Sequence, residues 1–298
     1  MKTLQIIKQD QDKTISLVEH ETSHTKYIQK ELNYYDKTLY QTLQKIKNPY
    51  LPKIFVIQEN DNHLTLIEEY IEGKTLDQQS FSKEQVKDIT HQLCECLDSL
   101  HKLNPPIIHR GIKPENIIYH DNKVTLLDFG IARFLDSKKS KDTLILGSVG
   151  YAAPEQFGFQ QSNPQTDIYA LGKLMNYLLN GSLEHQNNIS FDLKQVILKA
   201  TQLDYKNRYN SVKEMDLAIQ QKLVVIPPFN NDTFKSKMIS LAWITFTLMI
   251  VVDMEPGETI NNSFIIEPLI TEVTRFLGTG FYRNLSYQAI PAVPAVFY

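Results

Sequence analysis

Polar residues that could hold a metal-bound phosphate concentrate in two short stretches near the middle of the chain. The first is His109-Arg-Gly-Ile-Lys-Pro-Glu-Asn116, and the second is Asp128-Phe-Gly130. The carboxylate of Asp128 and the amide of Asn116 offer hard oxygen ligands, which Mg²⁺ prefers. Such a pair would suit phosphoryl transfer, because Mg²⁺ neutralises charge on the phosphate oxygens. The alternative is that both residues only cap loops.

Two further stretches follow in the same order along the chain: Gly147-Ser-Val-Gly-Tyr-Ala-Ala-Pro-Glu155 and Asp167-Ile-Tyr-Ala-Leu-Gly172. With these four stretches, residues 1–222 resemble the eukaryotic-like Ser/Thr protein kinases, especially the bacterial ones. Each tripeptide alone is a weak signal, whereas their shared order and spacing are specific. The resemblance implies transfer of the ATP γ-phosphate to a hydroxyl group of a protein, with ATP and Mg²⁺ as cofactors.

The resemblance also assigns roles in the large lobe. Lys113 would place a cation beside the γ-phosphate, and Asp167 would brace the catalytic loop by hydrogen bonds. Glu155 and Arg208 would form a structural ion pair. Ser148 would help to hold the substrate hydroxyl, with a plain loop serine as the alternative. His109 is a packing residue in this family, so we assign it no chemistry.

Nucleotide contacts are expected from the N-terminal part of the chain. Tyr27-Ile-Gln-Lys30 matches the family's third-strand pattern, so Lys30 would hold the α- and β-phosphates, unless it is a solvent-facing strand lysine. The hinge would be Glu68-Glu-Tyr-Ile71. By position in the family, the Glu69 carbonyl and the Ile71 amide would pair with adenine.

The chain departs from the family first at Gly111. This glycine stands where the family has the aspartate that accepts the proton of the substrate hydroxyl. General-base catalysis contributes about 10²–10⁴-fold, or about 3–5 kcal/mol. We therefore expect weak or lost phosphoryl transfer, while nucleotide and metal contacts use other residues.

A second departure is the stretch Lys8–Lys13, which has no glycine although the family covers the phosphates with a glycine-rich loop. Glycine lets a backbone approach phosphates closely. Asp10 and Asp12 would add negative charge there unless they point outward. We expect weakened ATP affinity; the alternative is a short turn whose remaining contacts suffice.

A third departure concerns the partner of Lys30. The register from Asn48-Pro49 puts Leu39 where the family's helix has a glutamate. Glu68 lies at the position that guards the back of the adenine pocket, and a buried glutamate without a cation would be costly. We therefore predict that Glu68 pairs with Lys30.

The segment from Asp128 to Glu155 corresponds to the activation segment. Candidate phosphorylation sites in it are Ser137, Ser140, Thr143 and Ser148. Arg110 is retained, and in such kinases this arginine can bind a loop phosphate. The same segment carries lysines at 138, 139 and 141, and such a charged run is more often simply exposed to solvent.

The order of predicted elements indicates an α+β, two-lobed plan. Short runs between Leu4 and Val56 alternate apolar and polar residues as half-buried strands do, and a helix is expected over Asp36–Lys47. Two strands follow near 54–58 and 64–69. A capping box at Ser82 and Gln85 starts a long helix, with further helices near 167–179, 191–200 and 212–222. The N-lobe would span about 1–72 and the C-lobe about 73–222.

Composition excludes other classes. The net charge of −3 gives no reason to expect a nucleic-acid partner. Cys94 and Cys96, two positions apart on a predicted helix, point apart, so we interpret them as core thiols in a reducing compartment. The N-terminus lacks a long apolar segment, so no signal peptide is expected.

The C-terminal quarter carries no motif. Residues 223–237 are predicted to be a linker, and 238–252 form an uncharged apolar run. A helix rises about 1.5 Å per residue, so a helix of this length would be somewhat short for crossing a bilayer. We expect a short membrane-spanning helix, with a buried helix or strand as the alternative. Lysines before it would place the kinase-like domain in the cytoplasm. The role of 253–298 stays open.

Three functions follow from these observations. The first is a pseudokinase or strongly impaired kinase that acts in signalling or scaffolding through a protein partner. The second is an active Ser/Thr kinase that works without the aspartate. The third, a small-molecule phosphotransferase, is disfavoured by the segment ending in Ala153-Pro-Glu155, because that element presents protein substrates.

Overall fold

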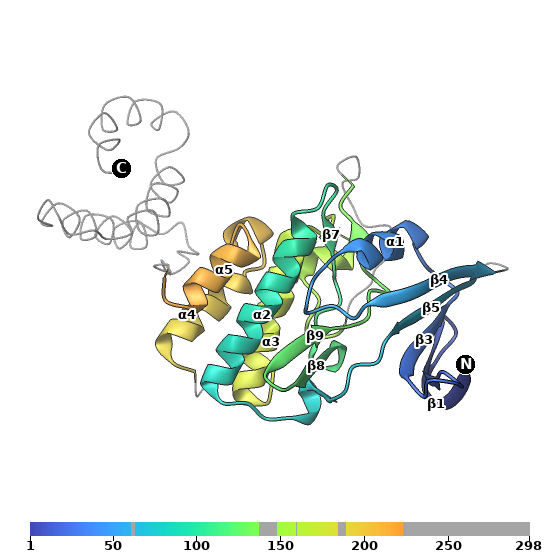
Figure 1. Ribbon diagram of the computed structural model, residues 1–298. Coiled ribbons are helices and arrows are strands. Elements are labelled where there is room, and N and C mark those ends of the chain that lie inside the picture. The colour runs from blue at the N-terminus through green and yellow to red at the C-terminus, as the bar shows by residue number, and fades with distance from the viewer. Residues whose placement is uncertain (61–62, 137–147, 159, 184–188, 223–298) are drawn as a thin grey trace, which may run out of the picture. The chain divides into compact units, whose positions relative to one another are not determined.

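The computed structural model describes residues 1–60, 63–136, 148–158, 160–183 and 189–222 (Figure 1). The chain divides into two units between Ile219 and Gln220, and the first unit carries the elements below. The predicted linker, apolar run and C-terminal tail lie outside the described residues, as do Ser137, Ser140 and Thr143. Within the described ranges, no helix has the length and apolarity needed to cross a bilayer.

The N-terminal part is a five-stranded antiparallel sheet with the strand order β1-β2-β3-β5-β4. Its strands are β1 (Lys2–Gln9), β2 (Lys13–Glu19), β3 (Lys26–Leu32), β4 (Ile54–Asn60) and β5 (His63–Glu69). β3 lies in the centre, where β-branched and aliphatic residues of β3 and β5 pair in register, for example Leu32 with Leu64. Figure 1 shows these strands gathered at the N-terminal end of the first unit.

The prediction that the first strand is half-buried is wrong. Every residue of β1 is exposed, including Leu4, Ile6 and Ile7. β1 is an edge strand whose apolar residues are not covered by any of the described residues. β2, one position further in, does alternate, with Ser16 and Val18 buried.

One helix, α1 (Lys37–Lys45), packs beside the sheet. Asp36 caps its N-terminus, because its side chain accepts hydrogen bonds from the backbone N–H groups of Thr38 and Leu39. Leu39, Tyr40 and Leu43 form its buried face. The predicted helix over Asp36–Lys47 is thus confirmed within two residues.

Four α-helices form the C-terminal part of the described unit (Figure 1). They are α2 (Lys83–His101), α3 (Pro164–Asn180), α4 (Phe191–Ala200) and α5 (Val212–Ile219). The predicted capping box starts α2: Ser82 Oγ accepts the Gln85 N–H, and Gln85 Oε1 accepts the Ser82 N–H. Cys94 and Cys96 are free thiols in the buried face of α2.

Short elements hold the central loops against these helices. β7 (Ile107–Ile108) pairs with β10 (Arg133–Phe134), and β8 (Ile117–His120) lies between β6 (Lys74–Thr75) and β9 (Lys123–Leu126). Four 3₁₀ helices complete the described elements: η1 (Leu76–Gln78), η2 (Pro114–Asn116), η3 (Pro154–Phe157) and η4 (Tyr205–Asn207). These pairings bring the loop 109–113 next to the loop 127–132. Strands come first and helices follow, so the predicted α+β, two-lobed plan is confirmed.

Candidate active site

The loop that begins at His109 is fixed by Asp167, which lies in the first turn of α3. Asp167 Oδ2 accepts the His109 N–H at 3.0 Å, and Asp167 Oδ1 accepts the Arg110 N–H at 2.8 Å. His101 of α2 contacts the same carboxylate at 2.8 Å. Burial alone would raise the pKa of Asp167, but His101 and the backbone donors lower it overall, so the carboxylate is ionised. Asp167 thus braces the loop, including Arg110 in its left-handed conformation with φ of 65°.

His109 is a buried packing residue with a defined hydrogen-bond pattern. Its ring stacks edge-on against Phe129, with the ring centroids 4.7 Å apart. Nδ1 accepts the N–H of Gly111 at 3.2 Å, so Nε2 carries the proton and donates to the Leu127 carbonyl at 3.1 Å. Burial also lowers the pKa of His109. The neutral ring therefore ties the catalytic loop to Leu127, which lies between β9 and Asp128.

Gly111 sits between these anchors and its backbone is fully used. Its carbonyl accepts a hydrogen bond from Asn116 Nδ2 at 2.8 Å. A Cβ at this position would lie 3.4 Å from Ile131 Cδ1 and 3.6 Å from His109 Cε1, which is ordinary van der Waals contact. Its φ angle is not positive, so the backbone does not demand glycine. The position lacks a side chain although it has room for one.

Asp128 follows β9 and contacts a lysine from the N-terminal sheet. Lys13 Nζ lies 2.7 Å from Asp128 Oδ2, and the N–H of Gly130 donates to Asp128 Oδ1 at 3.2 Å. Burial alone would raise the pKa of Asp128, but the charge and hydrogen bond of Lys13, with smaller effects of Lys30 and Gly130, lower it to about 2. Asp128 is therefore a carboxylate at neutral pH, with its negative charge balanced by Lys13.

Lys30 and Glu68 are brought together on neighbouring strands of the same sheet. Lys30 Nζ lies 2.6 Å from Glu68 Oε2, and their side chains are only 11% and 5% exposed. The solvent-facing alternative for Lys30 is therefore excluded. Leu39 is buried in α1, and the next residue, Tyr40, lies near both carboxylates: burial and the charges of Glu68 and Asp128 raise its pKa.

The remaining predicted site residues are placed as follows. Glu69 ends β5, and Ile71 comes two residues later, where the chain leaves the sheet. Lys113 is half-buried at the start of η2, whose last residue is Asn116. The Ser148 carbonyl accepts the N–H groups of Tyr151 and Ala152 and so starts the turn before η3. Arg110 donates from Nη1 to the Ile131 carbonyl at 3.3 Å.

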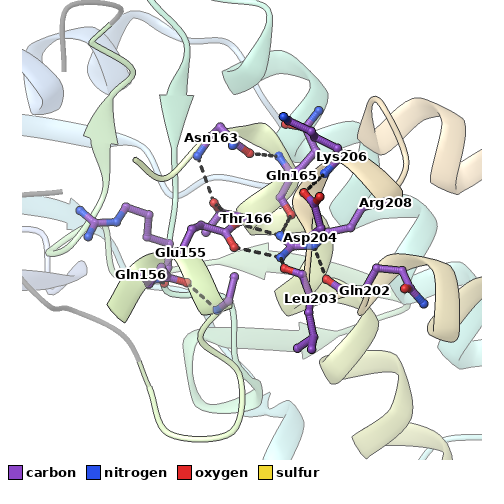
Figure 2. A network of polar contacts seen from close by, with 12 residues as sticks. Glu155, Gln156, Asn163, Gln165, Thr166, Gln202, Leu203, Asp204, Lys206 and Arg208 are labelled. Carbon is purple, nitrogen blue, oxygen red and sulfur yellow. Dashed lines mark hydrogen bonds and ion pairs between the residues drawn. The ribbon is translucent and has the colours of Figure 1, made fainter. Parts of the chain in front are cut away.

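The predicted ion pair between Glu155 and Arg208 is present and buried (Figure 2). Arg208 Nη1 and Nη2 donate to the two carboxylate oxygens of Glu155 at 2.7 and 2.9 Å. Thr166 Oγ1 donates to Glu155 Oε1 at 2.7 Å. The neighbouring Gln156 reaches the other way and donates to the Arg110 carbonyl at 3.0 Å. The Glu155–Arg208 pair thereby supports the catalytic loop through one intervening residue.

Comparison with known proteins decides the family. The family model described as "Protein kinase domain" matches residues 5–242. The chain belongs to the protein kinase domain family. Serine/threonine-protein kinase D of Synechocystis sp. is 34% identical over 197 residues, which cover 58% of this chain and 38% of that protein. Serine/threonine-protein kinase PrkC of Bacillus subtilis is 29% identical over 210 residues, which cover 60% of this chain and 32% of that protein.

The chain spans well under half the length of these two relatives. The resemblance to bacterial Ser/Thr kinases is confirmed at the family level. The family uses ATP and Mg²⁺.

The site residues fit the metal that the family uses. Mg²⁺ is commonly held by one or two carboxylates together with phosphate oxygens. Asp128 is ionised, and Asn116 donates from Nδ2 to Gly111, so its Oδ1 is the atom a metal would use. Among the described residues no group of three or more His, Cys, Asp or Glu side chains could hold a metal ion. Asp128 and Asn116 would therefore hold Mg²⁺ only with the help of nucleotide phosphates.

Two residues of this kinase domain were missed from the sequence. Lys13 lies 115 positions before its partner Asp128, so spacing along the chain gives no signal for the pair. Tyr40 follows Leu39, the residue at the expected glutamate position, and no motif marks it. The only sequence signal was the lysine that ends the glycine-free stretch Lys8–Lys13.

Proposed function

We propose that this chain is a Ser/Thr protein-kinase-like domain that binds a nucleoside triphosphate but transfers phosphate very weakly, and that it acts as a signalling or scaffolding module. The observation that carries the proposal is Gly111, where the loop keeps its backbone anchors but offers no proton acceptor. Loss of the orienting base would lower transfer by about 10²–10⁴-fold.

The residues of the nucleotide site support binding. Lys30 is buried and available to the α- and β-phosphates from the sheet, and Lys113 is available beside the γ-phosphate. Asp128 and Asn116 would hold Mg²⁺, which when bound neutralises charge on the phosphates. The Glu69 carbonyl and the Ile71 amide would meet adenine. Any residue type could supply those two backbone groups.

The geometry of the glycine-free turn lessens the effect that the negative charges of Asp10 and Asp12 would have on a bound triphosphate. Asp10 Oδ1 accepts the N–H groups of Asp12 and Lys13 at 3.0 and 2.9 Å, so this carboxylate closes the turn itself. Asp12 is exposed. Reduced ATP affinity remains our expectation, because the backbone of such a turn approaches phosphates less closely than glycines allow.

The test is to restore the carboxylate. Gly111→Asp should raise incorporation of labelled phosphate from ATP by about 10²-fold or more, because the Cβ fits and the loop is already in place. Gly111→Asn is the matched control: it has the same shape but cannot accept the proton as a base, so it should stay near the wild-type level.

The outcomes separate the alternatives. Incorporation of labelled phosphate by the unaltered chain at rates ordinary for protein kinases would overturn the proposal. Equal labelling by the Asp and Asn variants would show that the missing base is not the limiting defect.

An active protein kinase is the second candidate. The intact Glu155–Arg208 pair and the braced catalytic loop favour it, since these parts shape a site for a protein hydroxyl. The segment that ends in Ala153-Pro-Glu155 argues against a small-molecule phosphotransferase, because that element presents protein substrates. If wild-type labelling is measurable and Asp128→Asn abolishes it, the domain is an enzyme. Attachment to a membrane through residues 238–252 stays a prediction, which fractionation of the full chain against a truncation at Phe234 would test.

A further inference from the structure

Lys13 is built into the sheet so that its ammonium group lies over Asp128. It is the first residue of β2, directly after the turn that Asp10 closes, and its carbonyl accepts the Asp10 N–H at 3.0 Å. The backbone at both ends of the turn is therefore fixed. The Lys13 side chain is 16% exposed, which leaves its head group little freedom to lie elsewhere.

The register of the sheet places Lys13 beside the other phosphate-facing lysine. On β2 and β3, Lys13 pairs with Leu32 and Ile15 pairs with Lys30. Side chains two residues apart on a strand share a face, and directly paired residues share a face as well. Lys13 and Lys30 therefore project from the same face of the sheet.

The two lysines have different carboxylates. Lys30 is held by Glu68 at 2.6 Å, and Lys13 is held by Asp128 at 2.7 Å. Asp128 is the residue that would carry Mg²⁺ in this family. One of its oxygens faces Lys13 and the other accepts the Gly130 N–H. A divalent ion at Asp128 would therefore have to share or replace the Lys13 contact.

We propose that Lys13 is an intrinsic cation that takes over the charge-neutralising role at Asp128, so that a nucleoside triphosphate binds with little dependence on divalent metal. This inference rests on the proposed function, since it presumes that the domain binds a nucleotide. An ammonium group has three donors, so Lys13 can keep Asp128 as one acceptor and offer the others to phosphate oxygens. Such charge-assisted hydrogen bonds are the strong ones in a partly buried site.

The test measures ATP binding by the full chain with excess EDTA and with Mg²⁺, by calorimetry. Wild-type affinity should differ by less than about threefold between the two conditions. Lys13→Met should bind about tenfold or more weakly in EDTA, as expected for loss of a charged hydrogen bond, and should recover with Mg²⁺ because Asp128 is released.

Two variants control the result. Lys2→Met removes the same charge from the first residue of another strand in the sheet, is exposed, and should behave as wild type. Lys13→Arg keeps a cation at the site and should keep binding in EDTA. If Lys13→Met alters the fold, seen as a lost unfolding transition, the arginine variant and the wild-type comparison still decide.

Each outcome has a consequence. Wild-type binding that requires Mg²⁺ overturns this inference and leaves the proposed function intact. The inference is also overturned if Lys13→Met binds ATP with Mg²⁺ while the wild type binds it neither in EDTA nor with Mg²⁺. Lys13 would then block ATP from the site. No binding by any variant in either condition overturns both the inference and the nucleotide-binding part of the proposed function.

Discussion

Burial decides what each charged residue near the loops 109–113 and 127–132 can do. Gly111 has no side chain, and its backbone N–H and carbonyl alone anchor it in the loop. Lys30 and Glu68 are both almost fully covered, so each side chain has little access to water and depends on the other as its polar partner. Removing one partner would leave the other charge buried and unpaired.

Glu68→Gln should therefore destabilise the domain by about 2–4 kcal/mol, because Lys30 would stay buried without its carboxylate partner. Urea unfolding measures the difference. Glu59→Gln is the matched control: it makes the same change on β4 of the same sheet, in an exposed pair with Lys37 of α1, and should cost no more than about 1 kcal/mol. Equal costs for the two variants would show that burial does not set the strength of the Lys30–Glu68 pair.

At the scale of elements, packing outweighs intrinsic propensity at the junction of α3 and α4. Gly172 lies in the middle of α3, where glycine is about 1 kcal/mol less favourable than alanine. A Cβ there would lie 2.8 Å from both Ala200 Cβ and Thr201 Cγ2, at the end of α4. The two helices approach too closely at this point for any side chain.

Gly172→Ala should consequently destabilise the domain by about 1–2 kcal/mol, since overpacking of a buried contact outweighs the gain in helix propensity. Thermal unfolding checks the sign. Lys173→Ala changes the next residue on the same helix, which is half-buried, and should stay within about 0.5 kcal/mol of wild type. A stabilised Gly172→Ala would mean that α4 shifts freely away from α3.

Elements whose signals are local could be predicted, and contacts between distant segments could not. The capping box at Ser82 marked the start of α2, because both of its hydrogen bonds lie within four residues. The start of α3 was placed three residues late, at Asp167, because its cap, Asn163 followed by Pro164, was not recognised. Alternation in β1 indicated a strand but not which strand lies at the edge, so its exposure was missed.

The same distinction holds for the site. The catalytic loop, Asp128, Lys30 and the Glu155–Arg208 pair could be assigned because the family's motifs carry them. The contact of Lys13 with Asp128 depends on how the β1–β2 turn lies over the loop 127–132, and no spacing encodes that placement.

Within the first unit, the sheet and the helices are joined by a few polar contacts. Lys13 reaches Asp128, and Asn48, after α1, donates to Ser99 Oγ in α2 at 2.7 Å. The backbone N–H of Leu126 donates to the Tyr50 carbonyl at 2.8 Å. The first contact holds Lys13 over the loop 127–132. The loops 109–113 and 127–132 are otherwise held by a network of hydrogen bonds within the helical part.

That network converges on Arg208, which joins the segment before α5 to η3 and α3 (Figure 2). Besides Glu155, its guanidinium donates to the carbonyls of Gln165, Gln202 and Leu203. Five donors in a fixed plane satisfy these acceptors together, which a lysine cannot reproduce. The charge of residue 208 is thus only part of its role.

Arg208→Lys should destabilise the domain by about 2–4 kcal/mol even though the charge is kept, because buried carbonyls and one carboxylate oxygen lose their donors. Arg133→Lys is the matched control at a half-buried arginine that donates to the Phe134 carbonyl, and it should cost less than about 1 kcal/mol. Urea unfolding gives both values. Because Gln156 carries the support on to the Arg110 carbonyl, amide exchange at 109–111 should also quicken in Arg208→Lys and not in Arg133→Lys. A stability loss without faster exchange in that loop would show that the Glu155–Arg208 pair holds the helices together but does not brace the catalytic loop.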